Sequence, residues 1–170
     1  KPRFVNEMVE KPSGLGMPNT LFVNATGLPS TWGGRDGYPT ASDMACLARE
    51  ALRHQEILKW SSTRSKVFME HPLFVMNNTN PLLGTYPGCD GLKTGYTKAA
   101  GYHLIATARV DGVRLIAIIM HAESNDARAA GCARLLDYGF WNTVYGEHST
   151  LTFSDRVRIL TTDIVRRTVK

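Results

Sequence analysis

No part of this 170-residue chain is apolar over a long enough run to cross a membrane as a helix. A spanning helix needs about 18 or more consecutive apolar residues, and every apolar run here is shorter. The first residues also lack the charged and then apolar pattern of a secretory signal peptide. If the protein is exported, we therefore expect this chain to be a mature or trimmed product.

Cysteine is scarce, and its placement argues against a metal centre. The three cysteines are Cys46, Cys89 and Cys132, and an odd number leaves at least one thiol unpaired. Cys46 and Cys132 fall in apolar helical patterns and are expected to be buried small hydrophobes, while Cys89 is more simply a packing residue than a reactive thiol. His103 and His121 lie in predicted strands without a partner at ligand spacing. The sequence predicts no metal and no cofactor.

Charge and composition exclude two further classes of protein. Lys and Arg exceed Asp and Glu by 20 − 15 = 5, but the basic residues are scattered and no nucleic-acid-binding motif occurs, so we expect no nucleic-acid partner. A hydrophobic content of 43% is too high for a disordered chain. The length and composition predict one packed domain or slightly less.

The clearest structural signal is a pair of apolar runs, 102–110 and 113–121, separated by Asp111-Gly112. An Asp-Gly pair between two β-rich runs is a strong hairpin signal, because a type I′ turn needs positive φ at both central residues. The runs are almost continuously apolar, which favours central strands covered on both faces, although antiparallel strands more often alternate. A well-buried antiparallel hairpin is therefore predicted here.

Just before this hairpin stand Lys93, Thr94 and Gly95. A lysine offers a cation, a threonine offers a hydroxyl, and a glycine lets a ligand backbone approach a strand closely. Together they suit recognition of a carboxylate. The tripeptide alone is also compatible with an exposed strand start that carries a solvated lysine.

Helical patterns flank the predicted strands. Residues 3–10 resemble the end of a helix, Thr40 is a good N-cap with Asp43 as a capping-box-like acid, and residues 126–140 form a third helix with one apolar face. Short strands are expected at 66–69 and 73–76. An α+β fold follows, with an antiparallel sheet flanked by helices.

The residues around the tripeptide extend this picture to a known family. The segments 90–97 and 100–102 closely resemble the Lys-Thr-Gly motif of the low-molecular-mass penicillin-binding proteins, the serine-type D-alanyl-D-alanine carboxypeptidases. Further matches follow in the family's order, at Leu15–Thr20, Asn24–Leu28, Thr40–Met44, Asn78–Asn80, Leu82–Gly84 and Leu135–Phe140. They cover most of residues 3–142.

The resemblance implies the penicillin-recognising serine DD-peptidase/β-lactamase-like fold and an acyl-enzyme mechanism. Lys93 and Thr94 would bind the terminal carboxylate of a peptidoglycan stem peptide ending in D-Ala-D-Ala, beside Gly95. The backbone N–H of Tyr96 would be an oxyanion donor. Arg128 either matches a substrate-binding arginine of the family or is a solvated residue of a first helical turn, whose loss would cost little stability. β-Lactams are the implied inhibitors, and the bacterial cell envelope outside the cytoplasmic membrane is the implied location.

Two motifs of the family are absent from the sequence. No serine is followed three positions later by lysine, and Ser124-Asn125-Asp126 resembles Ser-x-Asn only superficially because it follows Lys-Thr-Gly. In the family both motifs lie upstream of the segment that matches residues 3–10. We therefore expect residues 1–142 to be the carboxy-terminal part of a catalytic domain, with residues 143–170 a strand-like tail or the start of a β-domain. The amino-terminal segment with the nucleophile would be on a separate fragment or would have been removed, and this chain would be inactive alone.

Three functions remain open at this point. The first is a D-Ala-D-Ala carboxypeptidase whose nucleophile segment lies elsewhere. The second is a non-catalytic relative that binds peptide or peptidoglycan. The third is a class A β-lactamase-like hydrolase, which also uses Lys-Thr-Gly but does not match the surrounding residues.

Overall fold

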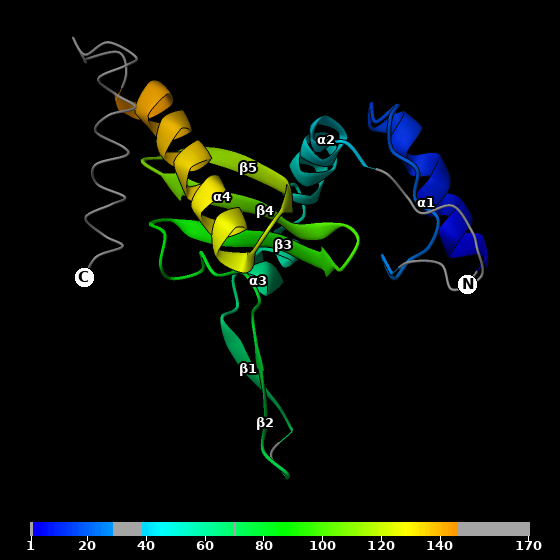
Figure 1. Cartoon of the computed structure of the whole chain (residues 1–170), viewed down its shortest axis with the longest axis horizontal. Coiled ribbons are helices and arrows are strands. Elements are labelled where there is room, and N and C mark those ends of the chain that lie inside the picture. The colour runs from blue at the N-terminus through cyan, green and yellow to red at the C-terminus, as the bar shows by residue number, and fades with distance from the viewer. Residues whose placement is uncertain (1, 29–38, 70, 146–170) are drawn as a thin grey trace.

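The computed structural model describes residues 2–28, 39–69 and 71–145 of the chain. The elements in chain order are helices α1 (Pro2–Gly14), α2 (Ala41–Ala51) and α3 (Gln55–Ser61), strands β1 (Ser65–Met69), β2 (Phe74–Asn77), β3 (Cys89–Thr97), β4 (Gly101–Val110) and β5 (Val113–Ala122), helix α4 (Asn125–Phe140) and a π-helical turn (Trp141–Tyr145) (Figure 1). This is the predicted α+β arrangement. The extended segments expected at 151–153 and 157–160 lie outside the described residues.

The main sheet has three antiparallel strands in the order β3-β4-β5. The predicted hairpin is confirmed, since β4 and β5 pair from Tyr102 with Ala122 to Val110 with Val113. The turn residues Asp111 and Gly112 have φ of 48° and 82°, the positive values that a type I′ turn requires. Strand β3 is an edge of this sheet, which places Lys93-Thr94-Gly95 on an edge as predicted.

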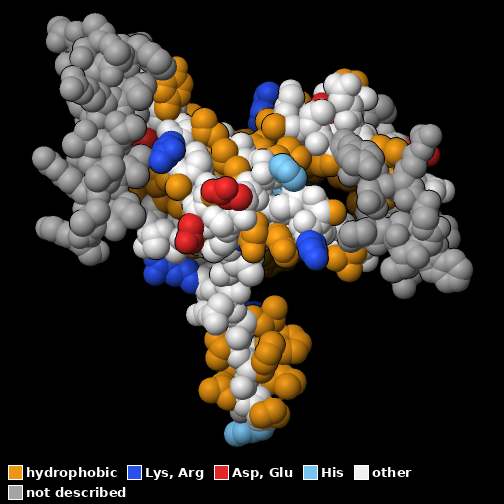
Figure 2. All heavy atoms as spheres, viewed as in Figure 1, with side chains coloured by type: hydrophobic (Ala, Val, Ile, Leu, Met, Phe, Trp, Pro, Cys, Tyr) orange, Lys and Arg blue, Asp and Glu red, His pale blue; other side chains and the backbone are white. Residues whose placement is uncertain are grey.

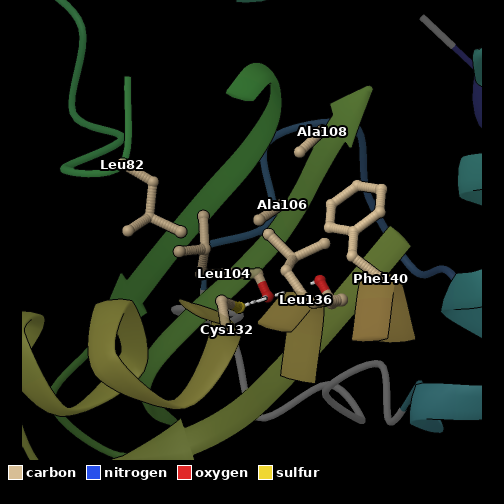
Figure 3. Close-up of a cluster of buried hydrophobic side chains, with 8 residues drawn as sticks. Leu82, Leu104, Ala106, Ala108, Cys132, Leu136 and Phe140 are labelled. Atoms are coloured by element: carbon tan, nitrogen blue, oxygen red, sulfur yellow. Dashed lines mark hydrogen bonds between the residues drawn. The ribbon is translucent and has the colours of Figure 1, made fainter. Parts of the chain in front are cut away.

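Helix α4 lies across one face of the sheet and encloses the core between them (Figure 1). The core side chains are Leu82, Leu104, Ala106, Ala108, Ala117, Cys132, Leu136 and Phe140 (Figure 3). Strand β4 is as deeply buried as its apolar run predicts. The prediction that both runs are central strands is wrong for β5, because it is the other edge of the described sheet, and most of its residues are only half-buried.

Thr40 caps α2 as predicted, and its hydroxyl accepts a hydrogen bond from the backbone N–H of Asp43. The carboxylate of Asp43, however, bonds the loop before the helix: it accepts from the Asn19 backbone N–H at 2.9 Å and from the Thr20 hydroxyl at 2.7 Å. Asp43 is only 3% exposed, so these two donors compensate its burial. Asp43 therefore ties the segment after α1 to α2.

Strands β1 and β2 form a separate antiparallel hairpin that projects from the body of the molecule (Figure 1). Every strand residue in it is exposed, and Figure 2 shows hydrophobic side chains gathered around it. The apolar residues at the strands and the turn are Val67, Phe68, Met69, Leu73, Phe74, Val75 and Met76, each at least 42% exposed. An exposed apolar cluster of this kind is typical of a surface that contacts another macromolecule.

One ion pair connects the two edges of the main sheet across β4. Arg114 on β5 donates to both carboxylate oxygens of Asp90 on β3, at 2.8 and 2.7 Å, and to the hydroxyl of fully buried Thr107 at 2.9 Å. Both charged side chains are about three-quarters buried, at 26% and 29% exposure. Removal of either partner would therefore leave the other charge largely buried without its counter-charge.

We expect Arg114→Met to lower the free energy of unfolding by about 2 kcal/mol, because Asp90 and the hydroxyl of Thr107 lose their donor. Urea unfolding followed by circular dichroism measures this change. Arg134→Met replaces an exposed arginine on α4 and serves as the control, with an expected change within about 0.5 kcal/mol. Equal stability of the two variants would show that the Asp90–Arg114 pair is energetically neutral.

Candidate active site

Lys93, Thr94 and Gly95 lie together on the edge strand β3. Lys93 is exposed, and its ammonium donates to the backbone carbonyl of Thr94. A Cβ added to Gly95 would meet the Cβ of His103 at 3.8 Å, which is an ordinary contact. Packing among the described residues therefore does not demand glycine at this position, whereas close approach of a ligand backbone would.

The hydroxyl of Thr94 lies 2.6 Å from the hydroxyl of Thr79, in the segment between β2 and β3. The neighbours of Thr79 hold this segment in place: the Asn78 side chain donates to the carbonyls of Ser61 and Thr63 at 3.0 Å, and the Asn80 side chain donates to the carbonyl of Gly91 at 2.9 Å. Sequence reasoning did not single out Thr79. It lies inside a segment that matches the family, but nothing in that match distinguishes Thr79 from the two asparagines.

Arg128, in the first turn of α4, is 5% exposed. The interpretation as a solvated surface arginine is therefore wrong. Its guanidinium donates to the carbonyls of Gly95 at 3.1 Å and His103 at 2.8 Å, to the Asn125 side chain at 2.9 and 2.6 Å, and more weakly to the carbonyl of Thr79 at 3.5 Å. Burial lowers the pKa of Arg128, but an arginine stays charged at neutral pH.

The position of Arg128 explains how a cation is tolerated near a helix N-terminus, where the helix dipole disfavours it. Besides these acceptors, the guanidinium lies 5.4 Å from the ring centroid of Tyr102, in cation–π geometry. The Tyr102 ring in turn stacks on the ring of Tyr96, with centroids 4.3 Å apart. Arg128 thus connects α4 to the end of the edge strand, next to Lys93-Thr94-Gly95.

Two histidines lie beside this end of the strand pair. The backbone N–H of His121 donates to Nδ1 of His103 at 3.3 Å, and Nδ1 of His121 lies 2.9 Å from the carbonyl of Ala100. Partial burial is the main cause that lowers the pKa of His103, which favours its neutral form. His103 is half-buried and His121 is exposed, so neither lies in the core. The described part of the chain contains no group of three or more His, Cys, Asp or Glu side chains placed to hold a metal ion.

The cysteines are packing residues rather than nucleophiles in this arrangement. Cys132 is fully buried, and burial raises its pKa to about 12. Burial also raises the pKa of Cys89, which is half-buried beside Asn80. The thiolate is the reactive form, so neither residue is activated. The prediction that Cys132 is a buried small hydrophobe is confirmed, while Cys46 is half-buried.

Ser124 has a structural role that excludes the weak second-motif match. Its hydroxyl caps α4 by accepting from the Ala127 backbone N–H at 3.0 Å. Asn125 holds the guanidinium of Arg128. Ser124 and Asn125 are therefore occupied in fixing the start of α4, and neither is a free counterpart to Lys93.

Comparison with known proteins decides the family. The D-alanyl-D-alanine carboxypeptidase family model matches residues 1–124, which is most of the chain. The chain belongs to the D-alanyl-D-alanine carboxypeptidase family. It is 39% identical over 139 residues to D-alanyl-D-alanine carboxypeptidase DacF of Bacillus subtilis and 33% identical over 138 residues to DacA of Escherichia coli. These alignments cover 81% of this chain but only 35% and 33% of the two relatives.

Solved structures of the family share the fold. Penicillin-binding protein D2 of Listeria monocytogenes, solved with bound cefotaxime, is 34% identical with a TM-score of 0.73. The Streptomyces K15 DD-transpeptidase is 26% identical with a TM-score of 0.71. Each match covers 81% of this chain, and the chain spans 55% and 53% of the two solved proteins. The fold is therefore the predicted DD-peptidase fold, and the chain spans about half of it.

Proposed function

We propose that this chain supplies the carboxylate-binding half of a serine-type D-alanyl-D-alanine carboxypeptidase. The substrate is a peptidoglycan stem peptide that ends in D-Ala-D-Ala, and β-lactams are its inhibitors. A serine attacks the peptide bond between the two D-alanines, the acyl-enzyme forms as the terminal D-alanine leaves, and water releases the acyl group. The serine lies outside this sequence.

The placement of Lys93, Thr94 and Gly95 on the edge of the sheet carries the proposal. The ammonium of Lys93 and the hydroxyl of Thr94 are donors for a carboxylate, and charge-assisted hydrogen bonds are the stronger kind. The absence of a side chain at Gly95 leaves room for a peptide to lie along β3, although the protein's own packing would tolerate a methyl group there. This edge fits an extended peptide with a free carboxyl end.

We assign the backbone N–H of Tyr96 as one oxyanion donor. Residues two apart in a strand direct their backbone groups the same way, so Tyr96 presents its N–H on the side where Thr94 presents its own. The Lys93 ammonium donates to the carbonyl of Thr94. This contact favours an arrangement in which the backbone groups of Thr94 and Tyr96 point to the free edge of β3. A backbone donor does not depend on the tyrosine side chain.

For Arg128 the contacts favour a positioning role over a direct hold on the substrate. All its guanidinium nitrogens already donate to protein acceptors, and two of these are the carbonyls of Gly95 and His103. Its charge still lies near the proposed carboxylate site and adds to the field there. We propose that Arg128 orients the end of β3 and attracts the substrate's carboxylate without binding it through a free N–H.

The proposed partner is an amino-terminal fragment with Ser-x-x-Lys and Ser-x-Asn, which would lie opposite Lys93 and complete the substrate site. The exposed apolar hairpin of β1 and β2 is a surface that such a polypeptide can cover. The proposed site of action is the cell envelope, where peptidoglycan lies. None of the described helices is both long and apolar enough for a transmembrane span.

A second candidate is a non-catalytic relative that only binds peptidoglycan peptides. Such a relative would keep the exposed Lys93 and the Thr94 hydroxyl on the edge strand, which can bind a carboxylate without a nucleophile. The two candidates separate when the chain is combined with an amino-terminal fragment: the carboxypeptidase then forms an acyl-enzyme with penicillin, and the binding protein does not.

We expect the 170-residue chain alone to form no covalent adduct with penicillin, because it has no serine with a lysine three positions later. Intact-mass spectrometry after incubation with benzylpenicillin measures this directly. The chain combined with an amino-terminal fragment is the positive control, and there the adduct belongs on the fragment. A penicilloyl group on any serine of residues 1–170 would contradict the proposed division of the active site.

A further inference from the structure

Thr79 presents its hydroxyl to Thr94, the residue of the edge strand whose hydroxyl is the proposed donor to a carboxylate. The two oxygens, of Thr79 and Thr94, are 2.6 Å apart, which is a good distance for a hydroxyl–hydroxyl hydrogen bond. Thr79 is exposed, so burial does not account for this contact. The contact therefore needs another explanation.

The backbone around Thr79 is held from three directions, so the contact does not depend on a loosely placed loop. The N–H of Asn78 donates to the carbonyl of Arg64 at 2.8 Å, and the Asn78 side chain bonds the end of α3. Asn80 is 6% exposed and bonds the carbonyl of Gly91 on β3. The carbonyl of Thr79 lies 3.5 Å from a guanidinium nitrogen of Arg128. These contacts fix the backbone of Thr79, so that its side-chain hydroxyl lies against the hydroxyl of Thr94.

The direction of the hydrogen bond matters because each hydroxyl has one proton. If Thr94 donates to Thr79, the proton of Thr94 is used and its oxygen lone pairs repel a carboxylate. If Thr79 donates to Thr94, the proton of Thr94 remains available to the carboxylate. An anionic ligand therefore selects the second arrangement, and the two hydrogen bonds then strengthen each other.

We propose that Thr79 is a positioning residue for carboxylate recognition. Its hydroxyl donates to Thr94 and thereby directs the proton of Thr94 to the ligand's terminal carboxylate. This inference rests on the proposed function, because it takes the carboxylate edge of β3 as the binding site. It adds a residue outside the Lys93-Thr94-Gly95 strand and a specific role for its hydroxyl.

Binding of N-acetyl-D-alanine to the whole 170-residue chain tests the inference, with the backbone amide signal of Thr94 followed by NMR. We expect Thr79→Val to raise the Kd about three- to tenfold, the change that loss of one hydrogen bond produces. Thr79→Ser retains the hydroxyl and should bind as the parent does. Thr85→Val removes another exposed threonine hydroxyl, which donates to the carbonyl of Pro81, and serves as the matched control.

Two further measurements distinguish this role from a merely structural one. With N-acetyl-D-alaninamide, which has no carboxylate, the parent and Thr79→Val should bind equally. In a Thr94→Val background, Thr79→Val should have no further effect, because its only route to the ligand is through Thr94. An equal loss for acid and amide, or additive losses in the double variant, would overturn the inference.

Failure of the inference can be told apart from failure of the proposed function. If Lys93→Ala weakens binding of the acid while Thr79→Val binds like the parent, only the role of Thr79 is wrong. If Lys93→Ala also binds like the parent, or the parent shows no carboxylate-dependent shift at Thr94, β3 is not a carboxylate site and both proposals are wrong.

Discussion

When the chain is combined with an amino-terminal fragment that carries Ser-x-x-Lys, Lys93→Ala is expected to slow acylation by penicillin about ten- to a hundredfold. Lys93 is an exposed cation on the edge strand, and a carboxylate that loses one charge-assisted hydrogen bond loses about 1.5–3 kcal/mol. At 1.36 kcal/mol per factor of ten, this loss gives the expected range. Fluorescent-penicillin labelling under single-turnover conditions measures the rate.

Lys93→Ala should have almost no effect on the stability of the fold. Lys93 is exposed, and among the described residues its ammonium donates to the carbonyl of the next residue, so the melting temperature is expected to stay within about 2 °C of the parent. Lys98→Ala, which replaces another exposed lysine in the turn after β3, is the matched control and should acylate at the parent rate. If Lys93→Ala acylates as fast as Lys98→Ala, Lys93 is only the solvated start of a strand.

The sequence was sufficient to predict the local structure of this region. Asp111-Gly112 between two apolar runs identified the hairpin because only a few residue pairs adopt positive φ twice in succession, and both residues do so here. Thr40 identified the start of α2 for a similarly local reason, since the N-cap hydroxyl bonds a backbone N–H three residues away. Signals of this kind depend on neighbouring residues alone.

Contacts between distant segments could not be predicted in the same way. The prediction for β5 failed because a continuous apolar run does not reveal how many neighbours a strand has in its sheet. The Thr79–Thr94 contact joins residues 15 positions apart, through a segment whose path depends on bonds to α3 and to Gly91. The carboxylate of Asp43 likewise bonds a loop more than 20 residues earlier. Such partners follow from the tertiary fold, which the local pattern does not encode.

Arg128 is the clearest case in which the sequence position misleads, because it suggests an exposed side chain whereas the structure buries it. In the first turn of a helix an arginine is normally exposed and contributes little to stability. In the fold this turn lies over the end of β3 and β4, where the carbonyls of Gly95 and His103 and the ring of Tyr102 surround the guanidinium. Replacement of Arg128 is therefore expected to lower stability more than replacement of a surface arginine would.

Arg128→Met is accordingly expected to lower the free energy of unfolding by about 3 kcal/mol. The substitution leaves the Asn125 side chain and up to three backbone carbonyls without a donor, and each unsatisfied buried acceptor costs about 1–3 kcal/mol before the structure relaxes. Urea unfolding measures the loss. Arg134→Met on the exposed face of the same helix is the control and should change stability by less than about 0.5 kcal/mol.

Comparison of the stability and the acylation rate of Arg128→Met shows whether Arg128 positions β3 or binds the substrate directly. If Arg128 is a positioning residue, its replacement by Met should lower both the free energy of unfolding and the acylation rate, because the end of β3 loses the support that orients Gly95 and Tyr96. Arg128→Lys keeps the charge but cannot reproduce the forked donor set, so it should recover part of the acylation rate and little of the stability. If Arg128→Met unfolds at the parent's urea midpoint and loses only the preference for ligands with a free carboxylate, Arg128 binds the substrate directly and its contacts with the two strands are incidental.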